Sequence, residues 1–207
     1  MPIRILVAIT GLNYSGKAKV CRMLKDGGVH IFSMSGALNF LIAERHPRAD
    51  EIKAAMEAGE LVDSEITGDA FVRGMKELQS HESPSEVVAS DGFPRTKSQA
   101  ARLLAWCETN RVMPIAVDYQ ITLEVALERF FSAPKDRLER RDDNVLKIIG
   151  RRRLYEREIL PGLLDLQSAG VPVFRMSGDE DGHFRVNSAR ILDTVRLVKR
   201  TIDSNHV

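Results

Sequence analysis

The chain has 207 residues, with 30 lysines and arginines against 29 aspartates and glutamates and a formal net charge of +1 at pH 7. This length suits one domain with a full core, and the balanced charge argues against a nucleic-acid partner. No apolar run approaches the ~18 residues needed to cross a membrane. We expect no signal peptide, because the N-terminus leads straight into an apolar segment. Cys21 and Cys107 lack metal-ligand spacing, so we expect buried thiols in a reducing cytoplasm.

Five short apolar runs predict buried strands, and segments with helical periodicity separate them. The runs cover residues 3–9, 30–32, 87–89, 115–117 and 171–174. Strands that alternate with helices form a parallel sheet with helices on both faces, joined by right-handed crossovers. The sequence therefore predicts a five-stranded α/β protein whose ligands bind at the carboxyl ends of the strands.

The first run is followed directly by Gly11-Leu-Asn-Tyr-Ser-Gly16-Lys17. Gly11 lets the chain leave the strand, and Gly16 lets the backbone approach phosphate oxygens without a Cβ clash. Lys17 adds a positive charge where a helix should begin, so we interpret this segment as a phosphate-binding loop. The alternative is a glycine-rich turn with a solvated lysine. Ala18 and Lys19 supply no hydroxyl for Mg²⁺, which predicts a metal held through water or bound weakly.

Two segments are longer than a simple alternation of one strand and one helix requires. Residues 35–82 separate the second and third strands and indicate several helices, broken at Pro47 and Gly59. Residues 132–141 form a polar segment rich in lysine and arginine. That segment is either a solvated surface loop or a flap over phosphates, and we favour the flap because long loops in compact domains often act as lids.

A second polar motif, Asp91-Gly-Phe-Pro-Arg95-Thr, follows the third strand. Phosphoryl transfer needs positive charge around the moving group, and arginine suits this because it binds phosphate through two parallel N–H bonds. The candidates are Arg95, Arg129, Arg137, Arg140, Arg141, Arg151, Arg152 and Arg153. The last three are spaced about 100° apart on a helix, so we expect one to face inward. Any of them could instead form a surface ion pair worth ~0–1 kcal/mol.

In this order the segments resemble the adenylate kinase family of nucleoside monophosphate kinases over nearly the whole chain. The matching residues are Gly11–Lys17, Ser35-Gly36, Gly59–Val62, Glu65-Ile66, Asp91–Ala100, Arg140–Asn144, Arg151, Tyr155 and Pro161. The string from Asp91 to Ala100 is the most specific. The resemblance implies a P-loop NTPase-like fold in a single domain over 1–207. It also implies a helical acceptor-binding insertion at about 35–65 and a short lid at about 132–141.

The resemblance implies direct in-line transfer from ATP to AMP, giving two ADP, by a protein that we expect to be a monomer. The catalytic residues would be Lys17, Asp91, Arg95, Arg140 and Arg151, with Asp91 orienting Mg²⁺ through water and no residue binding the metal directly. Donor contacts would come from Gly11, Asn13, Tyr14, Ser15, Gly16, Lys17, Ala18, Lys19, Arg129 and Gly178. Acceptor contacts would come from Ser35, Gly36, Val62, Gly92, Arg95 and Gln99. Gln99 would hydrogen-bond the adenine of AMP.

The sequence departs from the family pattern Ser-Thr-Gly-Asp-x-x-Arg at the acceptor segment. Ala37 replaces the aspartate, and Phe40 replaces the arginine that grips the acceptor phosphate. Loss of a charged hydrogen bond worth ~1.5–3 kcal/mol predicts AMP binding weakened by roughly ten- to a hundredfold. Ala133 stands where a second lid arginine is expected, with Arg137 a few residues on. These departures leave two alternatives open, a kinase with a different monophosphate acceptor and a nucleotide-binding protein with little turnover.

Overall fold

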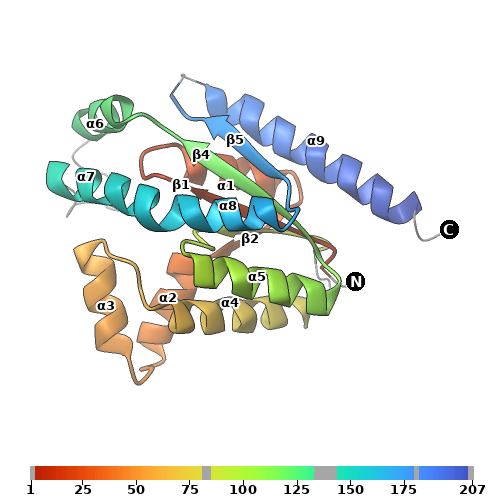
Figure 1. The fold of residues 1–207 in the computed structure, drawn as a ribbon, viewed down its shortest axis with the longest axis horizontal. Helices are drawn as coiled ribbons and strands as arrows, with labels where there is room; N and C mark the ends of the chain where they lie inside the picture. Colours follow the sequence, from red (N-terminus) through yellow and green to blue (C-terminus); the bar gives the residue numbers. More distant parts are fainter. Residues whose placement is uncertain (1–2, 81–84, 133–143, 180–181, 205–207) are drawn as a thin grey trace.

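The computed structural model describes residues 3–80, 85–132, 144–179 and 182–204. At its centre is a five-stranded sheet (Figure 1). The strands are β1 (Ile5–Gly11), β2 (His30–Ser33), β3 (Val87–Asp91), β4 (Met113–Gln120) and β5 (Val173–Ser177). They follow the order β2-β3-β1-β4-β5, and every neighbouring pair is parallel. The α/β fold predicted from the sequence is therefore confirmed.

The helices cover both faces of the sheet and extend it at one end. They are α1 (Lys17–Asp26), α2 (Met34–Ala43), α3 (Ala49–Ala58), α4 (Ser64–Gln79), α5 (Lys97–Asn110), α6 (Leu123–Phe131), α7 (Val145–Leu154), α8 (Leu160–Ser168) and α9 (His183–Ser204). A π-helical turn, η2 (Tyr155–Ile159), joins α7 to α8. The three helices between β2 and β3 form the extension, which lies below the sheet in Figure 1.

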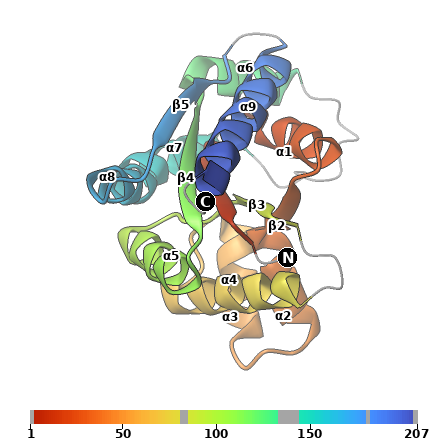
Figure 2. The ribbon, with the colours of Figure 1, turned by 90° about the vertical axis from the view of Figure 1, so that its right-hand side faces the viewer.

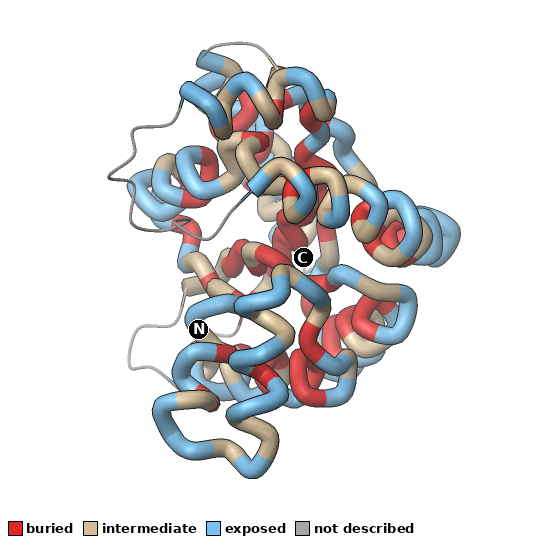
Figure 3. Tube along the Cα trace, turned by 90° about the vertical axis from the view of Figure 1, so that its left-hand side faces the viewer, coloured by how far each residue is buried: buried red, intermediate tan, exposed pale blue. Residues whose placement is uncertain are grey.

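The central strand β1 is buried on both faces, which explains its continuous apolar sequence. Ile5, Val7 and Ile9 belong to the core that α1 and α9 cover, whereas Leu6 and Ala8 belong to the core on the opposite face. Figure 2 shows α1 and α9 on one side of the sheet and α5 and α8 on the other. Figure 3 shows that exposed residues lie on the outer surfaces of the helices. The alternation of period two along the strand thus sorts its side chains between two cores.

The strand register brings the ends of β1, β2 and β3 together. Asp91 is paired with Ile9 of β1 and with Ser33 of β2, so all three strands end close to the same level. Gly11, the last residue of β1, is paired with Tyr119 of β4. The segments that follow these strands therefore emerge side by side at one edge of the sheet, where ligands of such sheets bind.

Both cysteines are buried, as the sequence predicted, and no disulfide joins them. Desolvation raises the pKa of the Cys21 and Cys107 thiols to about 12. Both thiols therefore stay protonated and unreactive near neutral pH. Within the described ranges, no helix combines the length and the apolar character that a bilayer crossing requires.

Candidate active site

The phosphate-binding loop runs from the end of β1 to the start of α1. Gly11 and Gly16 adopt positive φ angles of 131° and 94°, and Gly16 is the N-cap of α1. A Cβ on Gly11 would lie 2.1 Å from the carbonyl oxygen of Tyr119, and one on Gly16 would lie 2.7 Å from Nε2 of His183. Both positions therefore require glycine for space as well as for backbone conformation. The loop places backbone N–H groups at the positive end of α1, an arrangement that binds anions.

Lys17 folds back over this loop. Its Nζ donates to the carbonyl oxygens of Gly11 and Leu12, each at 2.8 Å. The hydroxyl of Ser15 is buried and donates to the same Leu12 carbonyl at 2.7 Å. Ser15 thus stabilises the loop conformation, while Lys17 keeps a positive charge above it.

Asp91 is the last residue of the neighbouring strand β3, and Arg95 lies in the segment that follows it. Asp91 and Lys17 both lie within electrostatic range of the Cys21 thiol, because the charge of Asp91 raises the pKa of that thiol and the charge of Lys17 lowers it. The Arg95 guanidinium lies over Gly92, since a Cβ there would be 2.7 Å from its Nη2. Water reaches Arg95, yet the surrounding protein lowers its pKa by desolvation. The carboxylate of Asp91 opposes that shift.

Arg151 completes the cationic group from a remote part of the chain. Its positive charge lowers the pKa of Arg95, so the two guanidinium groups lie within electrostatic range of each other. With the Asn13 amide turned so that its oxygen faces Arg151, that oxygen accepts from Nη1 at 2.7 Å and from Nε at 3.2 Å. Arg151 also packs against Gly59 at the end of α3, where a Cβ would lie 3.2 Å from Nη2.

The neighbouring arginines face elsewhere. Arg152 forms an ion pair with Glu156 at 2.6 Å and donates to the carbonyl oxygen of Ile121 at 3.2 Å. Arg153 is exposed. One of the three consecutive arginines therefore contacts the phosphate-binding loop, as helical periodicity requires.

The expected donor contacts meet on the other side of the loop. Arg129 donates to the carbonyl oxygens of Tyr14 at 3.0 Å and Asp179 at 3.3 Å. Gly178 packs so closely that a Cβ would lie 2.5 Å from the carbonyl oxygen of Ser15. By contrast, the side chains of Ala18 and Lys19 are exposed, and Lys19 lies over the ring of Phe184 at 4.8 Å.

The expected acceptor contacts lie at the starts of α2, α4 and α5. Ser33 caps α2 by accepting from the N–H of Gly36 at 3.2 Å, and its hydroxyl lies 3.1 Å from that of Ser35. Val62 is buried just before α4, whose N-cap Asp63 accepts from two backbone N–H groups. The start of α2 follows Ser33, which is paired with Asp91, and the start of α4 contacts that of α5 through the hydroxyls of Ser64 and Thr96. Helix N-termini favour negative charge.

Gln99 lies beside Arg95 but is enclosed by protein. Only 2% of the residue is exposed. Its Oε1 accepts from the Arg95 N–H at 2.7 Å, and its Nε2 donates to the Thr67 hydroxyl at 2.8 Å. Thr67 is a component that sequence reasoning missed, and the only local signal was a hydroxyl residue one turn into α4.

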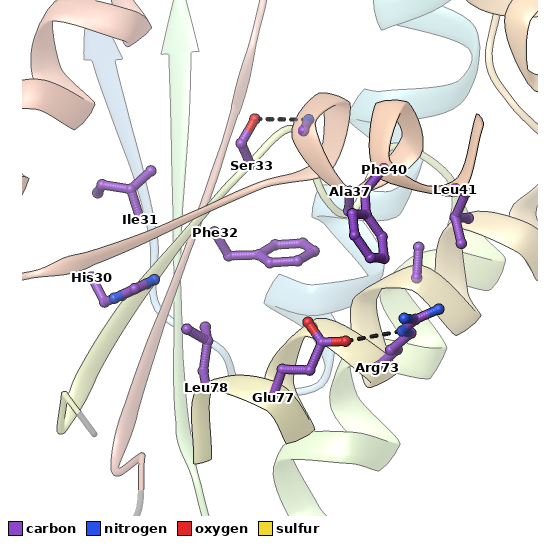
Figure 4. Close-up of a pocket in the computed structure, with 13 residues that line it drawn as sticks. His30, Ile31, Phe32, Ser33, Ala37, Phe40, Leu41, Arg73, Glu77 and Leu78 are labelled. Carbon is purple, nitrogen blue, oxygen red and sulfur yellow. Dashed lines mark hydrogen bonds and ion pairs between the residues drawn. The ribbon is translucent and has the colours of Figure 1, made fainter. Parts of the chain in front are cut away.

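Ala37 and Phe40 face a hollow that the expected acceptor residue Gly36 also lines. Both line a pocket of about 290 Å³ between β2, α2 and α4 (Figure 4). The guanidinium of Arg73 lies 5.1 Å from the centre of the Phe40 ring and pairs with Glu77 at 2.9 Å. Neither Arg95 nor Gln99 lines this pocket. The two substitutions thus shape the groove between α2 and α4.

Some predicted residues cannot be placed. Arg140, Arg137, Ala133 and nearly all of the lid segment at 132–141 lie outside the described residues. Within the described part of the chain, no group of three or more His, Cys, Asp or Glu side chains could hold a metal ion. The acidic group next to Lys17 and Arg95 is Asp91. A single carboxylate fits Mg²⁺ that keeps most of its water ligands, since this ion dehydrates reluctantly.

The parallel sheet with a glycine-bounded loop at the start of α1 defines a P-loop nucleotide-binding α/β protein. No family model matches the chain. It is 26% identical over 204 aligned residues to the adenylate kinase of Nitrosococcus oceani, and the alignment covers 84% of this chain and 92% of that protein. It is 28% identical over 135 residues to the adenylate kinase of a Synechococcus species, covering 65% of this chain and 67% of that protein. These similarities support the assignment of the chain to the adenylate kinase family.

Proposed function

We propose that this protein is a phosphotransferase that moves the γ-phosphoryl group of ATP to AMP and forms two ADP. The similarity to adenylate kinases supports a nucleoside monophosphate kinase. The observation that carries the proposal is the grouping of Lys17, Arg95 and Arg151 with Asp91 beside the phosphate-binding loop. Three cations from distant parts of the sequence around one loop are what transfer of a highly charged group requires.

The donor site in this proposal is the loop and its surroundings. The backbone N–H groups from Gly11 to Lys19 hold the ATP phosphates, and Lys17 exchanges its two carbonyl partners for phosphate oxygens. Arg129 and Gly178 lie where the adenine and its adjoining phosphates would bind. When bound, Mg²⁺ neutralises charge on the phosphates, and Asp91 orients it through water.

The acceptor site in this proposal centres on Arg95, which binds the phosphate of AMP. The path to that phosphate is lined by Ser35, Gly36, Val62 and Gly92. Gln99 lies beside Arg95, at the end of the site that would receive the adenine. Arg151, released from Asn13, and Arg140 neutralise the transferring group. Transfer in this proposal is direct and in line, with no covalent intermediate on Ser15, whose hydroxyl is buried and bonded to the loop.

Closure completes the site in this proposal. The insertion at about 35–65 closes over the acceptor, and the lid at about 132–141 closes over the donor, within one domain over 1–207. Such closure excludes water and aligns the two nucleotides. In this proposal the protein acts as a monomer, and the cytoplasm remains the expected location.

The test is an assay of ADP formation from Mg²⁺-ATP and AMP. The wild-type protein should turn over, and Lys17→Ala should lower kcat by at least ~10³-fold because the donor phosphates lose their nearest cation. A melting curve of each protein controls for folding. Wild-type turnover no higher than that of Lys17→Ala would contradict the proposal.

A second candidate is a nucleotide-binding protein with little turnover. Phe40 favours it, because an arginine that could grip the acceptor phosphate is replaced by an apolar side chain that lies beside Arg73. ATP binding that depends on Lys17, combined with no ADP formation, would support this candidate.

A further inference from the structure

The hydroxyl of Tyr155 is hydrogen-bonded to a buried carboxylate in the sheet. It lies 2.8 and 2.7 Å from the two carboxylate oxygens of Asp118 on β4. Asp118 is fully buried, and only 4% of Tyr155 is exposed. The Gln120 amide donates to the same carboxylate at 2.9 Å. Such a contact is strongly held, because a buried carboxylate that loses a donor is costly.

This contact lies directly beneath the phosphate-binding loop. Asp118 is paired in the sheet with Thr10, the residue that precedes Gly11 of the loop. Tyr155 belongs to η2, which also contacts β1. Neither Asp118 nor Tyr155 belongs to the insertion or to the lid that close in the proposed function. The contact therefore joins parts of the molecule that keep their places when those two segments move.

Tyr155 follows Arg151 by one turn of helix. Its backbone N–H donates to the carbonyl oxygen of Arg151, and α7 ends at this point because the helix becomes π-helical at Tyr155. Four residues of an α-helix turn through about 400°, so the two side chains project only about 40° apart. They leave the same face of α7, where Arg151 reaches Asn13 in the loop and Tyr155 reaches the sheet.

A helix with three consecutive arginines needs a fixed rotation about its axis if one of them is to act on a ligand. A rotation of about 100° would turn Arg151 away from the loop and bring Arg152 to its place. Two contacts oppose such a rotation. Arg152 donates to the carbonyl oxygen of Ile121, just after β4, at 3.2 Å, and Tyr155 is bonded within the core. The contact from Tyr155 is the one that water cannot replace.

We propose that Tyr155 is a positioning residue for Arg151. Its bond to Asp118 fixes the rotation of α7, and this rotation selects Arg151 over its two neighbours to face the transferring phosphoryl group. The inference rests on the proposed kinase function. It adds to that function a residue that acts without contacting a nucleotide.

The direct test measures kcat and KM for Mg²⁺-ATP and AMP in Tyr155→Phe. We expect kcat to fall about tenfold, since a misplaced catalytic group costs up to ~100-fold per ångström. Both KM values should change less than about twofold, because Arg151 acts on the transferring group and not on the bound substrates. An unchanged kcat would overturn the proposal.

Ile191→Val is the control for a purely structural effect. Ile191 is buried in the core that α1 and α9 cover, on the opposite face of the sheet from Tyr155. Removing a methylene there lowers stability without touching the contact with Asp118. We expect kcat within about twofold of the wild-type value when all variants are assayed well below their melting temperatures. A loss of kcat equal to that of Tyr155→Phe would overturn the proposal.

A double-mutant cycle with Arg151→Met separates positioning from every other role of Tyr155. Methionine leaves no guanidinium to position, so adding Tyr155→Phe in that background should change kcat by less than about twofold. The same tenfold loss in both backgrounds would mean that Tyr155 acts independently of Arg151, which would overturn the proposal.

Failure of the kinase proposal can be distinguished from failure of this inference. If the wild-type protein forms no ADP, the proposed function is wrong, and NMR spectroscopy then decides the role of Tyr155. The Nε–H of Arg151, which donates to Asn13, gives a resonance that is identified by its loss in Arg151→Met. Tyr155→Phe should shift or broaden this resonance, whereas Ile191→Val should leave it in place. An Arg151 resonance that is identical in Tyr155→Phe and the wild-type protein contradicts the inference.

Discussion

At the scale of single residues, the site depends on side chains and glycines that bring distant backbone segments close. Gly16 allows the loop to turn into α1 while the His183 ring occupies the space where a Cβ would be. Arg151 reaches from α7 to Asn13 in that loop. Sequence reasoning placed Gly16 and Arg151 through their motifs, but it gave no sign of His183, because a packing contact between loop and helix leaves no local pattern.

Gly16→Ala tests this packing. We expect Mg²⁺-ATP binding to weaken by about thirtyfold, because the φ of 94° and the clash with His183 each cost on the order of 1 kcal/mol. Calorimetric titration measures the effect. Gly28→Ala is the control, since Gly28 has a φ of 88° but a methyl group added there would have no neighbour within 4 Å. Equal ATP affinity in the two variants would contradict the assignment of the loop.

At the scale of secondary-structure elements, β4 shows where local patterns stop being informative. The apolar run predicted a strand at 115–117, whereas β4 extends from Met113 to Gln120 and includes Asp118, which is fully buried. The Tyr155 hydroxyl in η2 lies 2.8 and 2.7 Å from the two carboxylate oxygens of Asp118. Burial and then this bond raise the pKa of Tyr155 above its usual value. The hydrogen bond from Tyr155, 37 residues away in sequence, offsets the cost of burying the Asp118 carboxylate. A search for apolar runs cannot predict a strand that contains such a residue.

Tyr155→Phe should lower the free energy of unfolding by about 1–3 kcal/mol, because it removes a donor from a buried carboxylate. Urea denaturation measures this change. Tyr119→Phe is the comparison, since the Tyr119 hydroxyl is bonded at 2.6 Å to the neutral Asn187 side chain and its removal should cost less. A smaller effect for Tyr155→Phe than for Tyr119→Phe would show that the contact with Asp118 adds little to stability.

At the scale of the whole molecule, the sheet topology brings the functional segments together. The ends of β1 and β3 are adjacent in the register, so the phosphate-binding loop and the segment from Asp91 to Arg95 must lie side by side. That much followed from alternating strands and helices. The sequence could not show that Gln99 is held by Thr67, or that Phe40 faces the groove beside Arg73. Both facts depend on how α2 and α4 pack, which local periodicity does not determine.

The central claim is that Lys17, Arg95 and Arg151 act on one chain of phosphates. The most direct measurement is the affinity of a bisubstrate dinucleotide, two adenosines linked through a polyphosphate, compared with that of ATP. We expect binding at least ~100-fold tighter than that of ATP, because a linked ligand engages both sites at once. Arg151→Met should remove most of this advantage, whereas Arg153→Met, which alters an exposed neighbour, should preserve it. A dinucleotide that binds no more tightly than ATP, or that is indifferent to Arg151, would contradict the account.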